Sequence, residues 1–121
     1  MNRTEARELA FKTIYSKFFN FEENTENTEL ENNQLVNNII KNFIEHRNEI
    51  EEKIKSHLKG YTIERLYKID LAILMLAVIE LFYINENPKQ VIINEAVELA
   101  KKFSTEKSPK FINGVLADIV R

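Results

Sequence analysis

The sequence predicts an all-α protein of six or seven helices. The chain has 121 residues but only two glycines and two prolines, which leaves little material for the tight turns of an all-β fold. Charged residues make up 30% of it, and apolar residues recur at helical spacing over most of its length. The length suits one domain that buries roughly two-thirds of its unfolded surface without disulfides or metal.

Two segments near the C-terminus show the helical pattern most clearly. From Pro88 to Phe103 the apolar side chains fall on one side of a helix and the polar ones on the other. We expect a second helix to begin at Ser108 as its N-cap, with Pro109 at the first helical position. Its core face consists of Ile112, Val115, Leu116 and Ile119.

The first helix is expected to run from about Arg3 to Phe19. Asn2 can cap it, and Glu5 stands close to the position that a capping box requires. Its core stripe contains Ala6, Leu9, Ala10, Thr13, Ile14 and Phe18. A second stripe of residues spaced four apart lies along the flank of the core and consists of Arg3, Arg7, Phe11 and Tyr15.

The middle of the chain predicts an exposed loop and two further helices. The segment from Phe21 to Asn33 is acidic and lacks periodicity, so we expect a loop there. From Leu35 to Leu58 the apolar residues keep helical spacing, with a break near residues 46–48. Gly60 suits the position just past the end of a helix.

The next segment, residues 63–85, predicts a central helix. Thr62 can cap it, and a division near Lys68 is expected. After Asp70 the segment is apolar nearly all round, which is typical of a helix buried in the middle of a protein. It is interrupted by Glu80 and is too short to span a bilayer, so no membrane association is expected.

The composition excludes several kinds of functional site. The chain has no cysteine, and its two histidines, His46 and His57, are not at zinc-binding spacing. Gly60 and Gly114 stand alone, so there is no glycine-rich phosphate loop. No nucleophile, base or ligand set is recognisable. We therefore expect no enzyme activity, no metal and no cofactor. The lack of cysteine and of a visible signal peptide fits the cytoplasm.

A binding surface remains, near the start of the last helix. The net charge of −2 argues against bulk affinity for nucleic acid, but positive charge collects at both chain ends. Phe111 at the rim of the core can stack on an unpaired base, and Asn113 can hydrogen-bond a base edge beside Lys110. The alternative is that Phe111 closes the core while Lys110 and Asn113 are merely solvated. Spacing alone favours that alternative. Gly114 in mid-helix suggests that another backbone packs against this helix.

Several stretches of the chain resemble the bacterial NusB family. The most specific are Ile93–Lys101, which reads Ile-Asn-Glu-Ala-Val-Glu-Leu-Ala-Lys, and Phe111–Leu116, which reads Phe-Ile-Asn-Gly-Val-Leu. Residues 6–10 followed by Tyr15 resemble the first helix of the family, and residues 70–81 resemble its central helix. The resemblance implies two small helical bundles packed into one compact RNA-binding domain over residues 1–121.

The resemblance also implies a function in transcription antitermination. NusB proteins bind the single-stranded boxA element of ribosomal RNA leader transcripts together with NusE, a small-subunit ribosomal protein, in the RNA polymerase elongation complex. This supports processive transcription and ribosomal RNA maturation. Carried over to this chain, the expected RNA contacts are Arg3, Arg7, Lys107, Ser108, Lys110, Phe111 and Asn113, and the expected partner contacts are Tyr15 and Asp70. For Phe111 and Asn113, the resemblance therefore favours RNA contact, whereas spacing alone favours a core residue and a solvated residue.

The chain departs from the family pattern in its cations. The N-terminal arginine cluster is reduced to Arg3 and Arg7, and Leu71 and Met75 stand where relatives commonly carry arginine. We therefore expect tight RNA binding only in the presence of NusE. Ser104 replaces a usual helix-ending glycine, which would be strained if its φ were positive.

Two other functions are considered. One is a helical protein–protein adaptor or homodimerisation module that does not touch RNA. The other is the RNA-binding appendage of a ribosomal RNA methyltransferase, for which these 121 residues leave no room for a nucleotide-binding domain. The RNA hypothesis itself requires that the two ends of the chain fold side by side.

Overall fold

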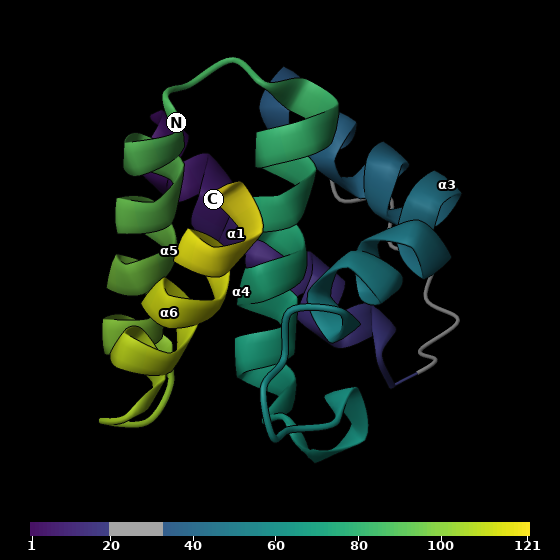
Figure 1. Cartoon of the computed structure of the whole chain (residues 1–121). Helices are drawn as coiled ribbons and strands as arrows, with labels where there is room; N and C mark the ends of the chain where they lie inside the picture. Colours follow the sequence, from purple (N-terminus) through teal and green to yellow (C-terminus); the bar gives the residue numbers. More distant parts are fainter. Residues whose placement is uncertain (20–32) are drawn as a thin grey trace.

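A computed structural model describes residues 1–19 and 33–121, and its helices surround one central helix (Figure 1). The α-helices are α1 (Arg3–Lys17), α3 (Gln34–Lys55), α4 (Lys68–Ile79), α5 (Lys89–Phe103) and α6 (Ser108–Val120). Two short turns adjoin α4: the 3₁₀ turn η1 (Ile63–Arg65) before it and the π-helical turn η2 (Glu80–Ile84) after it. The described ranges contain no strand.

The all-α prediction is confirmed, but the predicted count of six or seven helices is wrong, because residues 1–19 and 33–121 form five α-helices. The break predicted near residues 46–48 is found as a kink at His46, which has φ −123° and ψ 20°, but α3 continues through it as one element. Residues 63–65 make a single 3₁₀ turn and not the start of a long helix. The predicted acidic loop lies outside the described residues except for Asn33, whose side chain caps α3 by accepting from Val36 N–H at 3.0 Å.

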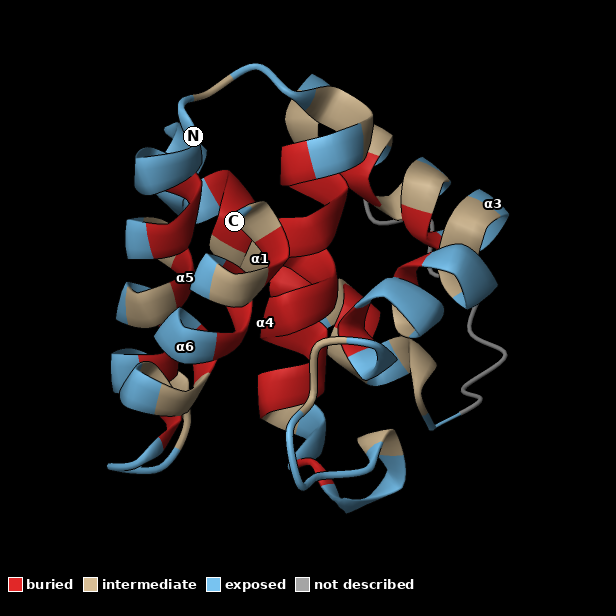
Figure 2. Ribbon diagram, viewed as in Figure 1, coloured by how far each residue is buried: buried red, intermediate tan, exposed pale blue. Residues whose placement is uncertain are grey.

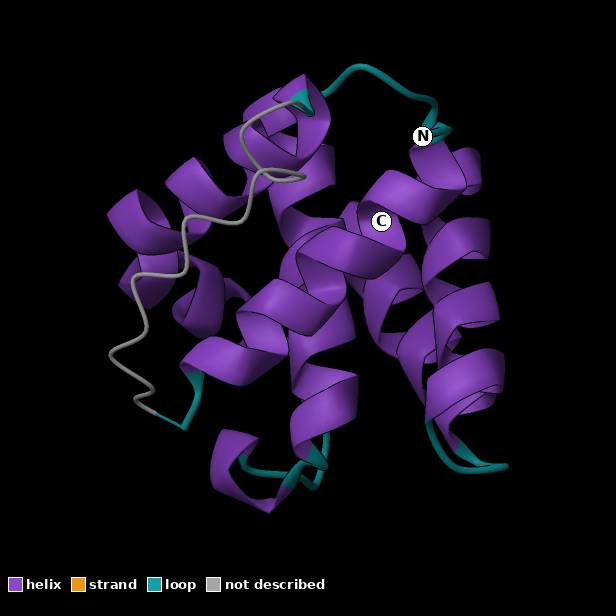
Figure 3. Ribbon diagram, turned by 180° about the vertical axis from the view of Figure 1, so that it is seen from behind, coloured by secondary structure: helices purple, strands orange, loops and turns teal. Residues whose placement is uncertain are grey.

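The centre of the molecule is α4, as the sequence predicts. Every residue from Asp70 to Leu81 is buried (Figure 2). α3 lies on one side of α4 and α5 and α6 on the other (Figure 1), while α1 crosses behind it, as the reverse view shows (Figure 3). A fully buried Leu or Ile contributes about 1.5–3 kcal/mol, so this helix supplies a large part of the driving force for folding. Within the described part of the chain, no helix is long and apolar enough to cross a membrane.

The predicted N-cap residue is confirmed for α1 but not for α6. Asn2 Oδ1 accepts from Glu5 N–H at 2.8 Å, which confirms it as the cap of α1. The prediction of Ser108 as N-cap is wrong, because Lys107 precedes α6 and makes no side-chain capping bond. Ser108 is the first helical residue, and its hydroxyl bonds elsewhere. Thr62 precedes η1, also without a capping bond.

Two backbone positions bear on the connections between helices. Gly60 lies further beyond α3 than predicted and has φ +78°, which glycine adopts without strain. Ser104 ends α5 with φ −117° and ψ −156°, an extended conformation. The strain considered for serine at that position does not arise.

Candidate nucleic-acid interface

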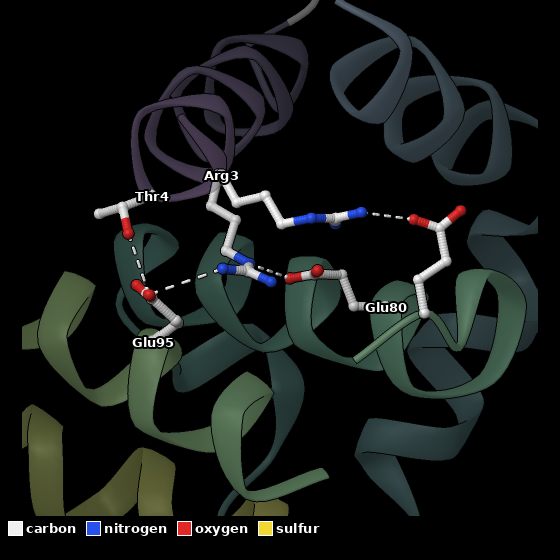
Figure 4. A network of polar contacts seen from close by, with 6 residues as sticks. Arg3, Thr4, Glu80 and Glu95 are labelled. Carbon is white, nitrogen blue, oxygen red and sulfur yellow. Dashed lines mark hydrogen bonds and ion pairs between the residues drawn. The ribbon is translucent and has the colours of Figure 1, made fainter. Parts of the chain in front are cut away.

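The N-terminal arginines lie at the C-terminal end of α4. Arg7 is only 2% exposed, and its Nε donates to Glu80 Oε2 at 2.8 Å. Its Nη1 is 3.6 Å from Glu95 Oε1, which also accepts from the Thr4 hydroxyl at 3.0 Å (Figure 4). Arg3 is exposed and pairs with Glu86 at 2.7 Å. This network joins α1 to η2 and α5, so the charge of Arg7 is compensated inside the protein.

A second buried network lies at the N-terminal end of α4. Asp70 is 3% exposed, and its two oxygens accept from the hydroxyls of Ser104 and Ser108, the latter at 3.0 Å. Ser108 Oγ in turn accepts from Thr105 N–H at 3.2 Å. The carboxylate therefore holds the turn between α5 and α6 against the start of α4. This is why the Ser108 hydroxyl does not cap its own helix.

These two networks separate the two parts of the predicted composite surface. Asp70 and Glu80 are ten residues apart in one helical segment, which corresponds to about 15 Å. Arg7 is held at one end of α4, whereas α6 begins at the other. The structure therefore brings Lys107, Ser108, Lys110, Phe111 and Asn113 together, but not Arg3 and Arg7 with them.

An aromatic and basic surface does form where α6 begins. Phe111 is half-buried and packs edge-on against Tyr61, with ring centroids 5.3 Å apart. Tyr61 and Tyr67 are exposed by 58% and 64%. These rings line a hollow of about 240 Å³ together with Leu66, Asp70, Thr105, Ser108 and the cationic Arg65 and Lys107. We call it the aromatic hollow. Lys110 and Asn113 are exposed on the same helix.

A second hollow is lined by the same two rings, Tyr61 and Phe111. It has a volume of about 310 Å³, and its other lining residues are His57, Lys59, Lys110, Gly114, Val115, Asp118 and Arg121. We call it the Gly114 hollow. A Cβ atom on Gly114 would meet nothing within 4 Å. No other part of the described chain therefore packs against Gly114, and the backbone expected there is not one of its own.

Sequence reasoning missed Tyr61, Arg65 and Tyr67. They lie in the connection between α3 and α4, where residues follow no helical period. The available signal was compositional: a short stretch with two aromatic residues and an arginine, next to Gly60.

The predicted partner contacts have different surroundings. Tyr15 is half-buried near the end of α1, and its ring lies edge-on to Phe19 with centroids 5.1 Å apart. Asp70 is buried, and each of its two oxygens already accepts a hydrogen bond from a serine hydroxyl. Residues 1–19 and 33–121 contain no cluster of three or more His, Cys, Asp or Glu side chains that could hold a metal ion.

Comparison with known proteins identifies the family. The NusB family model matches residues 4–121. The chain belongs to the NusB family. The transcription antitermination protein NusB of Oceanobacillus iheyensis is 38% identical over 125 residues, which cover 99% of each chain. That of Clostridium botulinum (strain Kyoto / Type A2) is 41% identical over 99% of this chain and all of its own. NusB proteins are RNA-binding antitermination factors and not enzymes, as the sequence predicts.

Solved NusB structures share the fold. T. maritima NusB superposes with a TM-score of 0.85 at 28% identity, over 98% of this chain and 90% of its own. A second structure contains the antitermination factors NusB and NusE in complex with double-stranded RNA. It matches with a TM-score of 0.80 at 30% identity, over 97% of this chain and 94% of the other. The all-helical NusB architecture is thus confirmed.

Proposed function

We propose that this NusB-family protein binds boxA-type single-stranded RNA of ribosomal RNA leader transcripts together with NusE. In this role it supports processive transcription by RNA polymerase and ribosomal RNA maturation. The observation that carries the proposal is the pair formed by the exposed Tyr61 ring and the half-buried Phe111 ring, among cations at the start of α6. The solved complex of a NusB with NusE and double-stranded RNA supports NusE and RNA as partners in general.

The aromatic hollow has the chemistry that unpaired bases require. Tyr61 and Tyr67 present exposed ring faces, and stacking on such rings contributes about 1–3 kcal/mol per base. Arg65 and Lys107 line the same hollow and can neutralise phosphates. Asn113, exposed on α6, can hydrogen-bond a base edge. Every cation of this surface is separate from the N-terminal arginines.

Other surfaces are less suited to RNA. The groove between α1 and α5 has a volume of about 720 Å³, larger than either hollow. It carries the carboxylates of Glu8, Glu95 and Glu98, which repel phosphate, beside Lys101 and Lys102. Mixed charge of this kind is more typical of ordinary surface than of an RNA site. We therefore place the RNA at the start of α6.

In this proposal, the buried residues that the family resemblance assigns to RNA or partner contact have a structural role. Arg7 positions α1, and Ser108 and Asp70 position the first turn of α6, without contacting RNA themselves. Arg3 retains partial exposure but is engaged by Glu86. Few cations remain for RNA alone, so we expect NusE to supply a large part of the affinity, with Tyr15 as a contact to it.

The test is charge reversal at Lys110, with Lys41→Glu as the matched control. Both lysines are exposed on helices, but Lys41 lies on α3 away from the α6 surface. Fluorescence anisotropy with a short single-stranded boxA-type RNA, with and without NusE, measures affinity. We expect Lys110→Glu to weaken binding about tenfold and Lys41→Glu to leave it unchanged.

Two results would overturn the proposal. Equal RNA affinity of Lys110→Glu and the wild type would remove the α6 surface from the interface. Equal affinity of the wild type with and without NusE would contradict the joint mode of binding. A protein–protein adaptor that never touches RNA would give no RNA signal in any variant.

A further inference from the structure

Gly114 is unexplained by the packing of this chain. It lies inside α6, is exposed, and would accommodate a Cβ without any contact. Glycine in a helix interior costs about 1 kcal/mol relative to alanine. Alanine would therefore serve the folded chain better. Glycine is expected where a ligand approaches the backbone closely, which directs attention to what the Gly114 hollow can bind.

The charge of the Gly114 hollow favours an anionic ligand. Lys59, Lys110 and Arg121 line it beside Asp118, which forms ion pairs with Lys59 and Arg121, so that the cationic side chains outnumber the carboxylate. Its volume of about 310 Å³ is at the small end of ligand pockets, which suits one unit of a longer ligand. Because the hollow shares the Tyr61–Phe111 wall with the aromatic hollow, a strand whose bases stack on these rings continues directly into it.

Asp118 gives the hollow a means of recognising a hydroxyl group. Its Oδ2 accepts a hydrogen bond from His57 Nδ1 at 2.7 Å. Its Oδ1 lies 3.6 Å from Lys59 Nζ and 3.7 Å from Arg121 Nη1, too far for hydrogen bonds. The bond from His57 lowers the pKa of Asp118, so the carboxylate is ionised and can only accept. Oδ1 therefore remains able to accept from a ligand donor.

We propose that the Gly114 hollow binds a ribose–phosphate unit adjacent to the bases stacked at Tyr61 and Phe111, with Asp118 accepting a hydrogen bond from the ribose 2′-hydroxyl. The three cations hold the phosphates, and the bare backbone at Gly114 allows the sugar to approach α6. DNA lacks this donor, so the hollow selects RNA. This inference rests on RNA binding at the aromatic hollow.

The first test fills the hollow. Gly114→Gln introduces a side chain at the approach point, and Ala117→Gln places the same side chain on an exposed position of α6 that does not line the hollow. Affinity for the boxA-type RNA is measured by anisotropy with NusE present. We expect Gly114→Gln to weaken binding about tenfold, Ala117→Gln to leave it unchanged, and neither to lower the thermal midpoint. Wild-type affinity in Gly114→Gln would overturn the proposal.

The second test measures how much each ribose 2′-hydroxyl contributes to RNA affinity. Single 2′-deoxy substitutions are placed along the RNA, and each is measured against the wild type and Asp118→Ala. We expect one position at which deoxyribose weakens wild-type binding about tenfold and has no effect in Asp118→Ala. Deoxy losses that are the same in both proteins would overturn the assignment of Asp118.

The two proposals fail in distinguishable ways. No RNA binding by the wild type with NusE would overturn both. Binding that is weakened by Lys107→Glu, at the aromatic hollow, but indifferent to Gly114→Gln and Asp118→Ala would overturn only the ribose–phosphate site.

Discussion

A charged side chain is buried at each end of α4, and the two charges are stabilised by different kinds of contact. At its C-terminal end, a buried cation, Arg7, is compensated by Glu80 and more distantly by Glu95. At its N-terminal end, a buried anion, Asp70, is satisfied by the neutral hydroxyls of Ser104 and Ser108. Both sites are almost completely buried. One end depends on paired charges, and the other depends on hydrogen bonds alone.

The difference separates residues that hold the helices together from residues that are available to the proposed RNA site. Arg7, Ser108 and Asp70 occupy positions that the family resemblance assigns to RNA or partner contact, yet each is committed to holding helices together. The Asp70 network fixes the helix that carries Phe111, so it acts on the proposed site through position. The Arg7 network lies about 15 Å away along α4 and acts on the fold.

The largest effect on stability is expected when the buried cation at the C-terminal end of α4 is removed. Arg7→Met leaves Glu80 buried without its cation, and we expect the free energy of unfolding to fall by about 3–5 kcal/mol. Chemical denaturation measures this. The double variant Arg7→Met/Glu80→Leu should recover most of the loss, because no lone charge remains. Arg3→Ala, at an exposed ion pair, is the control and should change stability by about 0.5 kcal/mol or less. A loss for Arg7→Met no larger than this control would contradict the compensated-charge account.

Removing the anion at the other end should cost less. Asp70→Ala eliminates two hydrogen bonds to a charged acceptor, and we expect a loss of about 1.5–3 kcal/mol. Hydrogen exchange should also accelerate at the amides of Ser108 and Phe111, which donate to Thr105 and Lys107, because the turn before α6 loses its anchor. Unchanged exchange at these amides would show that Asp70 does not position α6.

A surface pair next to Arg7 sharpens the contrast between buried and exposed charge. Glu8 accepts from Lys102 Nζ at 2.6 Å, which also joins α1 to α5. This bond lowers the pKa of Glu8, so its contribution is present above the ordinary pKa and is lost as the pH falls through the lowered value. We expect Glu8→Gln to reduce stability by about 0.5 kcal/mol or less at neutral pH. The difference from the wild type should shrink in acid and in high salt, and a difference that persists there would refute an ionic origin.

Local features of the fold could be predicted from the sequence. The burial of α4 and the core face of α6 depend on periodicity, and the cap at Asn2 depends on its immediate neighbours. The burial of Arg7 could not be predicted from periodicity or from its sequence neighbours. Its spacing places it on the flank of the core, and only Glu80, 73 positions later, makes its burial possible.

The candidate site was predicted only in part for a similar reason. Lys110, Phe111 and Asn113 belong to one helix, so their common surface follows from spacing. Ser108 is diverted from capping by a carboxylate 38 positions earlier in the chain. Tyr61 reaches Phe111 from a connection without periodic structure, so the ring pair exists only in three dimensions.

The bend of α3 at His46 affects where Tyr61 lies relative to Phe111. Beyond His46, the straight remainder of the helix forms a lever arm, since ten residues extend about 15 Å. His57, Lys59 and Tyr61 follow its far end and form one wall of the Gly114 hollow. A change of about 4° in the bend would displace that end by about 1 Å relative to α6. The width of the Gly114 hollow therefore depends on the backbone angles of His46, although His46 does not line it.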